Sequence, residues 1–247
     1  MKQLKFLAAI PIIMAFCFTS CNNSSEEKKA DATTTAPDTT KAATTTTTPS
    51  APAKPDNMLV VIHKVANYAK WLPVYESDDS ANTASGLTKY VLGRGLGNDS
   101  NTVMVAMKMS DITKAKALGN SDHLKAKMKM AGVIGAPTIF FEEAVFQDTT
   151  TLAPNVARVM VTHKVKDWDA WKKSFDSHKQ TRSDNGLADR AIGHSVGDNH
   201  SVSVVFAITD QAKADAFMKS QDLKDKMKEA GVEGPPDIFY YKVVQKN

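Results

Sequence analysis

Five side chains at helical spacing are the first place where this sequence could carry out chemistry. They follow one another at intervals of three, four, three and four residues, and they are Trp168, Trp171, Phe175, His178 and Arg182. Residues at these intervals share one face of an α-helix. An apolar groove that ends in His178 and Arg182 would suit an anionic or hydroxylated aromatic ligand, because the polar pair would orient it. The alternative is that both polar side chains lie at the helix end and extend into water.

Histidines on predicted strands form a second group of candidates. His63 and His163 occupy matching positions on two apolar strands, and His194 lies on a later strand where it could join His178 at one cavity. Because an imidazole titrates near neutral pH, the first pair could contact a ligand, bind a metal together or transfer protons. The alternative is a hydrogen-bonded histidine at the end of each strand. The histidines are irregularly spaced without a carboxylate at the i,i+4 interval, so we expect no metal site.

A repeat positions these candidates. The run Val61-Ile62-His63-Lys64-Val65 returns as Val161-Thr162-His163-Lys164-Val165, and Ala131-Gly132-Val133 returns as Ala230-Gly231-Val232. Such self-similarity predicts two units, residues 58–147 and 158–247, joined by a linker over 148–157. The first unit carries Asp78 and Asn82 where the second carries His178 and Arg182, so we expect the ligand site in the second unit.

Each unit is predicted to run strand, helix, strand, strand, helix, strand. The expected strands of the second unit are 158–165, 187–196 and 201–208, with a last strand from Ile238 because Pro236 forbids further helix. Asp167 is expected to cap a single first helix that continues to Gly186. This order is the ferredoxin-like split βαβ unit of an α+β protein. Helices cover one face of such a sheet, and the other face is apolar here, so the two sheets are expected to close on each other within one chain.

Three sequence features resemble the dimeric α/β-barrel superfamily, which includes antibiotic-biosynthesis monooxygenase-like and stress-responsive barrel proteins. They are a first strand ending in His-Lys-Val, the run Asp167-Trp168-x-x-Trp171, and the turn Ala-Gly-Val-x-Gly-x-Pro. The resemblance implies a tandem fusion in which a monomer builds the barrel that other members assemble from two chains. Fold alone does not fix function.

The resemblance leaves three functions open. The first, which we expect, is a cofactor-free protein that binds an apolar or aromatic small molecule in the second unit, through Trp171, Phe175, His178 and Arg182 with His163, His194 or His63. The second is a cofactor-independent monooxygenase that acts on a phenol or quinol near Trp171, His178 and Arg182. The third is a haem-binding barrel in which His163, His178 or His194 is the axial ligand.

The N-terminus resembles a bacterial lipoprotein signal. Lys2 and Lys5 precede an apolar stretch over 6–18, and Thr19-Ser20-Cys21 forms a small-residue cleavage site. Residues 1–20 would be the signal peptide and Cys21 the lipid-bearing residue, so we expect a protein anchored to the outer membrane of a bacterial envelope, on its periplasmic or surface side. The alternative is an ordinary secreted protein. The Thr-, Ala- and Pro-rich segment 21–57 is predicted to be a disordered tether.

Composition excludes several classes of function. The chain of 247 residues has a formal net charge of +4, and its basic residues form no block, so nucleic-acid binding is not expected. Its 2 cysteines are Cys17, within the predicted signal, and Cys21. The predicted units therefore contain no thiol for disulfides, thiolate catalysis or metal ligation.

Overall fold

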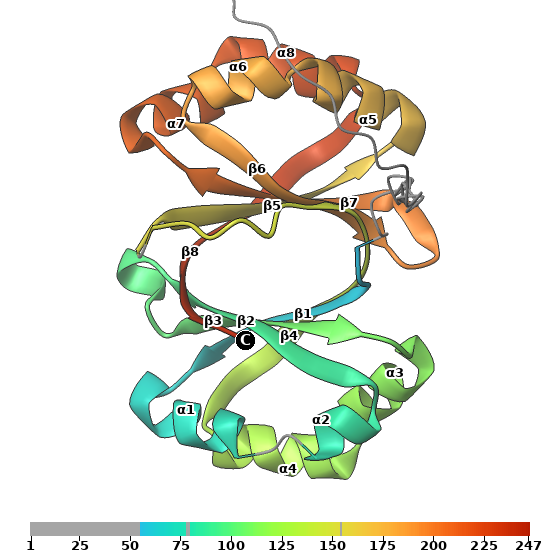
Figure 1. Ribbon diagram of the computed structural model, residues 1–247, viewed down its shortest axis with the longest axis vertical. Coiled ribbons are helices and arrows are strands. Elements are labelled where there is room, and N and C mark those ends of the chain that lie inside the picture. Colours follow the sequence, from blue (N-terminus) through green and yellow to red (C-terminus); the bar gives the residue numbers. More distant parts are fainter. Residues whose placement is uncertain (1–54, 78–79, 154) are drawn as a thin grey trace, which may run out of the picture. The chain divides into compact units, whose positions relative to one another are not determined.

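The computed structural model describes residues 55–77, 80–153 and 155–247, which belong to one compact unit. The predicted signal segment 1–20, Cys21 and the tether up to residue 54 lie outside the described residues. The described chain is an α+β structure in which eight antiparallel strands form a closed barrel and eight α-helices lie against its outer surface (Figure 1). No helix in the described ranges combines the length and apolar character needed to cross a membrane.

The first half of the barrel consists of strands β1 to β4 with helices α1 to α4. Its elements are β1 (Met58–Val65), α1 (Tyr68–Glu76), α2 (Ser80–Ala84), β2 (Leu87–Gly95), β3 (Thr102–Met109), α3 (Ile112–Asn120), α4 (Asp122–Met130) and β4 (Val133–Gln147), with a short 3-10 turn over Gly97–Asp99. Side-chain oxygens of Asn67, Asp111 and Ser121 cap α1, α3 and α4, so these helices begin at the first position after a capping residue.

The second half follows the same order. Its elements are β5 (Ala157–Val165), α5 (Trp168–Ser177), α6 (Lys179–Asp184), β6 (Leu187–Ser195), β7 (Asp198–Ile208), α7 (Gln211–Met218), α8 (Gln221–Glu229) and β8 (Val232–Lys246). The single helix expected from Asp167 to Gly186 is wrong, because the chain leaves helical geometry at His178 (φ −92°, ψ 6°). Arg182 from α6 then donates to the carbonyl oxygen of Phe175, one of those left at the end of α5.

The strand order around the barrel is β1-β3-β2-β8-β5-β7-β6-β4. The last strand of each half is long and is shared between the halves. The first part of β4 pairs with β1, and its end, Glu142 to Gln147, pairs with β6. In the same way β8 pairs with β5 and then, from Tyr241 onward, with β2. The barrel is therefore closed by backbone hydrogen bonds at two junctions, which leaves no free sheet edge.

The last strand of the second half begins earlier than expected, at Val232 instead of Ile238, and β4 begins at the matching Val133, so Pro236 and Pro137 lie inside these strands. The prolines fit because the ladder is irregular there: the register between β1 and β4 shifts between Ile62 and Lys64, and the matching shift occurs between β5 and β8. Proline has no N–H to donate, so within a strand it is confined to such bulges and to edges. Each bulge lies opposite a histidine, His63 in β1 and His163 in β5.

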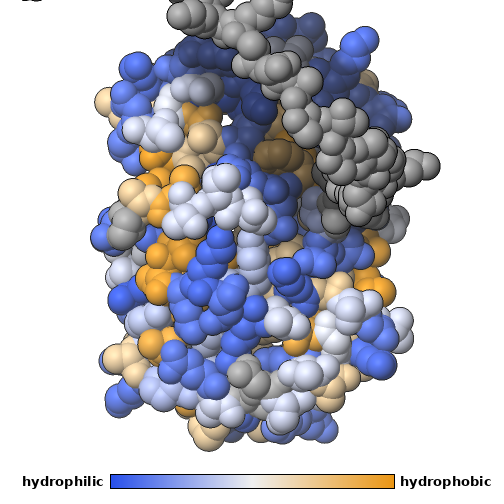
Figure 2. All heavy atoms as spheres, viewed as in Figure 1, coloured by the Kyte–Doolittle hydropathy of each residue, from blue (hydrophilic) through white to orange (hydrophobic). Residues whose placement is uncertain are grey.

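Successive side chains point to opposite faces of each strand, and this alternation divides the buried core into three layers. Side chains on the outer barrel surface pack under the helices of each half, around Trp71 in the first half and Trp171 in the second, each 3% exposed. Side chains on the inner surface, among them Met58, Met104 and Tyr241, form the third cluster inside the barrel. In the space-filling view of Figure 2, most of the visible face is hydrophilic and apolar residues are gathered in patches along its sides.

Candidate functional site

An apolar cavity lies between the helices and the outer barrel surface in each half of the described structure. The cavity of the second half, which we call cavity 2, has a volume of about 130 Å³ and is lined by His163, Trp171, Phe175, His178 and Arg182 among others. The matching cavity 1 has a volume of about 170 Å³ and is lined by His63, Trp71, Tyr75 and Asn82 among others. The sequence predicted a site in the second half, and the structure places an equivalent and larger cavity in the first half.

Stacked aromatic rings form one wall of each cavity. The ring of Trp171 lies 5.0 Å from that of Phe175, at an interplanar angle of 27°. Trp71 and Tyr75 are stacked in the same way at 4.9 Å and 10°. Offset stacking of this kind is the preferred arrangement of aromatic pairs. It follows from the helical spacing of these residues, which the sequence predicted to share one face.

A buried histidine faces each tryptophan. The rings of His63 and Trp71, and those of His163 and Trp171, lie 5.6 Å apart. Among the described residues, neither ring nitrogen of His63 or of His163 has a hydrogen-bond partner, although all four atoms are buried. The expected alternative of a hydrogen-bonded strand-end histidine is therefore wrong. Because the two residues lie in separate cavities, they do not contact a common ligand or metal.

Burial fixes the charge state of these two histidines. Removal from water disfavours the imidazolium and lowers the pKa of His63, and likewise that of His163, to about 4. Both rings are thus neutral at physiological pH, and each carries one N–H donor and one acceptor nitrogen. Each cavity consequently combines an apolar aromatic wall with one unused donor and one unused acceptor.

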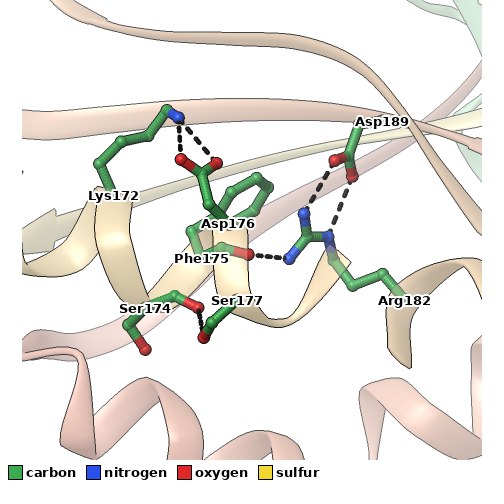
Figure 3. A network of polar contacts seen from close by, with 7 residues as sticks. All are labelled: Lys172, Ser174, Phe175, Asp176, Ser177, Arg182 and Asp189. Carbon is green, nitrogen blue, oxygen red and sulfur yellow. Dashed lines mark hydrogen bonds and ion pairs between the residues drawn. The ribbon is translucent and has the colours of Figure 1, made fainter. Parts of the chain in front are cut away.

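Arg182 is held by the protein itself (Figure 3). Its Nε and Nη2 atoms donate to the two carboxylate oxygens of Asp189 at 3.0 and 2.8 Å, and Nη1 donates to the carbonyl oxygen of Phe175 at 2.5 Å. Its guanidinium also lies 3.5 Å from the centre of the Phe175 ring. The side chains of Arg182 and Asp189 are 5% and 9% exposed. These contacts use three of the five N–H donors of Arg182, and the buried bidentate pair with Asp189 offsets its charge, so Arg182 mainly shapes the wall of cavity 2.

The two remaining predicted residues, His178 and His194, do not lie in the same cavity. His178 lies half-buried where α5 meets α6 and lines cavity 2, as expected. His194 is not part of the lining of cavity 2; its ring packs edge-on against Trp168 at 4.8 Å, and its Nδ1 lies 3.1 Å from the carbonyl oxygen of Ser195. The predicted meeting of His194 with His178 in one cavity is therefore not found. Nowhere in the described ranges do three or more His, Cys, Asp or Glu side chains gather as metal ligands would.

Two residues of consequence were missed by sequence reasoning. Asp189 neutralises Arg182, but it comes from β6 and no short-range pattern connects the two. Glu142 points into the barrel with 5% exposure, and burial raises its pKa to about 7, against the lowering effects of a hydrogen bond from Ser203 and of nearby His194. The sequence contains an indication of this residue. Glu142 alternates in phase with Phe140 and Ala144, so it occupies the face of the strand that is expected to be apolar.

Comparison with known proteins locates the fold. The sequence matches no protein-family profile, and no curated protein matches it. An anthrone oxidase-like protein is similar in structure, with 12% identity, 78% of this chain and 92% of that chain covered, and a TM-score of 0.53. A candidate monooxygenase from Fusobacterium nucleatum has 13% identity, covers 78% and 94% of the two chains, and gives a TM-score of 0.50.

A haem-binding protein from Thermus thermophilus is also similar, at 10% identity, 77% and 92% coverage and a TM-score of 0.47. The likenesses to the anthrone oxidase-like protein and to the Fusobacterium nucleatum protein, at such low identity, establish the fold and not the activity. The described chain therefore shares the fold of the anthrone oxidase-like protein and of the Fusobacterium nucleatum protein.

Proposed function

We propose that this protein binds small aromatic molecules that carry a hydroxyl group, one in each cavity under the helices. The observation that carries the proposal is the unpartnered, buried imidazole at the aromatic wall of each cavity. Leaving a buried polar group without a partner costs about 1–3 kcal/mol. A ligand hydroxyl that hydrogen-bonds to His63 or His163 would remove that cost, whereas a purely apolar ligand would not.

The cavity volumes set the size of the ligand. Cavities of about 130 and 170 Å³ bracket the roughly 150 Å³ apolar cavity that is known to accommodate benzene. A single aromatic ring with a small substituent therefore fits each cavity as it stands. The sequence-based expectation of an apolar or aromatic ligand in the second unit is extended here to both halves.

A monooxygenase acting on a phenol or quinol is the second candidate, and the oxygenase names of two structural neighbours raise it. The neutral imidazole of His163 would have to accept the phenol proton. A phenol with the usual pKa of about 10 faces a base whose conjugate acid has a pKa of about 4. Full transfer is uphill by about 8 kcal/mol before any gain from the ion pair. The geometry therefore favours binding over proton abstraction, and oxygen consumption with a panel of phenols and quinols would separate the two.

Haem does not fit the cavities of this structure. Cavities 1 and 2 are smaller than the roughly 300 Å³ at which pockets for drug-sized ligands begin, and a porphyrin is larger than such ligands. His194 lies apart from both cavities. Haemin added to the purified protein is expected to give no Soret band that shifts and stays with the protein through gel filtration. A retained, shifted band would establish haem binding and contradict this assignment.

We further propose the organisation of the whole chain. The repeated sequence and the matching element order of the halves support a tandem fusion of two ferredoxin-like units, which builds the barrel within a monomer. The lipoprotein-like signal supports a lipid anchor at Cys21 and a location in a bacterial envelope. Mass spectrometry of the N-terminal peptide of the mature protein would test the anchor, since an unmodified Cys21 would contradict it.

Methionine methyl groups allow the ligand to be located in solution. Met107 and Met128 line cavity 1, whereas Met218 and Met227 line cavity 2. In protein labelled with ¹³C at the methionine methyls, phenol is expected to shift all four signals. His163→Leu should weaken the response of Met218 and Met227 and leave Met107 and Met128 unchanged, and His63→Leu should do the reverse. Each variant thus contains its own control, and equal effects on both pairs would contradict the proposal.

A further inference from the structure

A third cavity lies inside the barrel and is separate from the two under the helices. Its volume is about 100 Å³. Most of its wall is apolar, as expected for the interior of a small closed barrel. Eight polar side chains nevertheless line it, and they are Tyr90, Glu142, Gln147, Asp148, Arg158, Arg190, Ser203 and Tyr241. Buried charge is costly unless it is paired, so this group calls for an explanation.

Four of these eight residues, Arg158, Arg190, Ser203 and Tyr241, come from strands of the second half. Arg158 pairs with Tyr241 between β5 and β8, and the matching pair between β1 and β4 is Met58 with Glu142. Likewise Ser203 pairs with Thr162, whereas Met104 pairs with Ile62. Methionine at both first-half positions shows that an apolar side chain fits this interior. Arginine and serine in the second half are therefore not required by the architecture of the barrel.

Two arginines line the cavity, the half-buried Arg158 and the buried Arg190. Arg190 is 5% exposed and donates through Nη1 to Asp148 and through Nη2 to the carbonyl oxygen of Thr150, but its buried Nε has no partner among the described residues. Arg158 hydrogen-bonds to the hydroxyl of Tyr241 and has no carboxylate partner within the described part of the chain. Asp148 thus offsets one of the two positive charges. The cavity therefore retains an unused N–H at Nε of Arg190, and Arg158 remains without a carboxylate partner among the described residues.

Glu142 and Ser203 form another polar wall of the same cavity. Ser203 donates from Oγ to Oε2 of Glu142 at 2.9 Å. The carboxyl group can accept a further hydrogen bond, because it has several lone pairs and Ser203 engages one of them. Gly193 borders this site, and a Cβ atom there would lie 2.8 Å from the carbonyl oxygen of Glu143 and 3.5 Å from Oε2 of Glu142. The absence of a side chain at Gly193 therefore keeps the space beside Glu142 open.

We propose that the barrel interior is a second kind of ligand site, which takes a small hydroxy carboxylate. The ligand carboxylate lies at Arg158 and the Nε of Arg190, and its hydroxyl group donates to Glu142. A volume of about 100 Å³ holds about three water molecules or an organic anion of about six non-hydrogen atoms. Charge-assisted hydrogen bonds to arginine are about twice as strong as neutral ones and give the site its preference for a carboxylate. This site is independent of the aromatic ligands proposed for cavities 1 and 2.

The methionine methyl signals also test this proposal, because Met58, Met104 and Met160 line the barrel cavity alone of the three. We would titrate the full chain with lactate, and with two probes that each lack one group: propionate, without the hydroxyl, and 1,2-propanediol, without the carboxylate. Lactate is expected to shift these three signals and leave Met107, Met128, Met218 and Met227 in place. Propionate should bind more weakly, and the diol should not shift them. No shift with lactate at high millimolar concentration, or an equal shift with the diol, would overturn the proposal.

A charge variant provides the matched test. Arg158→Gln shortens the side chain and removes its charge, and we expect at least a tenfold loss of lactate affinity. Lys164→Gln removes a charge from the same strand at the exposed Lys164–Asp198 ion pair, and should leave the affinity unchanged. If Arg158→Gln does not fold, Arg158→Lys keeps the charge without the planar donor pair and should lose affinity for the same reason. Equal lactate affinity in a folded Arg158 variant and in wild type would overturn the assignment.

Discussion

At the scale of single residues, His63 and His163 are the groups that distinguish a ligand site from ordinary core. A buried imidazole without a partner destabilises the fold by about 1–3 kcal/mol, so replacement by an apolar side chain of similar size should stabilise it. His163→Leu is therefore expected to raise the free energy of unfolding in urea by about that amount, with an unchanged m-value. The exposed His200→Leu serves as control. A loss of stability in His163→Leu would show that the imidazole is already satisfied.

The same residues predict how stability changes with pH. The pKa of His63 and of His163 is about 4 in the folded chain, against 6.5 when unfolded. Between these values the unfolded chain binds more protons, so stability is complete above pH 6.5 and falls as the pH drops toward 4. Glu142, whose pKa is raised to about 7, acts in the opposite direction, since its contribution is present below pH 4.5 and is lost as the pH rises through 7.

The contributions of His63 and His163 to the free energy of unfolding fall on acidification, and together they outweigh the single opposite contribution of Glu142. The wild type should therefore lose stability from pH 6.5 to 4.5. The double variant His63→Leu, His163→Leu should lose less over the same range. Urea unfolding at pH 4.5, 5.5, 6.5 and 7.5 measures both, and parallel curves for the two proteins would contradict the assigned pKa values.

At the scale of elements, the Arg182–Asp189 pair connects α6 to β6 and holds the end of α5. Breaking a buried pair from one side leaves an uncompensated charge, which costs about 3–5 kcal/mol. Asp189→Ala should therefore destabilise by about that amount, measured as the free energy of unfolding. Asp176→Ala removes the exposed i,i+4 partner of Lys172 and should cost only about 0.3–0.5 kcal/mol. Similar costs for the two variants would show that the pair is not buried in solution.

The sequence predicted elements well where the deciding interactions are local. The cap expected at Asp167 is confirmed, because its side chain accepts from the backbone N–H of Ala170, within one helical turn. Interactions across elements were not accessible in the same way. Arg182 was interpreted as a ligand group because Asp189 approaches it only once β6 is in place. Pro236 was expected to precede the last strand, whereas it lies within β8, because the bulge that admits it depends on pairing with β5.

At the scale of the molecule, closure of the barrel explains both kinds of cavity. The outer surface of each half is covered by its own helices, which creates two similar aromatic cavities. The inner surfaces meet through the shared strands β4 and β8, which creates the single cavity inside. The sequence indicated an apolar inner face, and most of that face is apolar. Its polar exceptions, among them Glu142, Arg158 and Ser203, could be brought together only by knowing how the two halves join.

The affinity ratio of phenol to benzene tests the central claim most directly, because the two ligands differ only in the hydroxyl group that His63 and His163 are proposed to bind. The ratio should be about tenfold higher in the wild type than in the double variant His63→Leu, His163→Leu, since one satisfied buried hydrogen bond is worth about 1.4 kcal/mol in this setting. Benzene affinity itself should change little. An equal ratio in the two proteins would contradict the account.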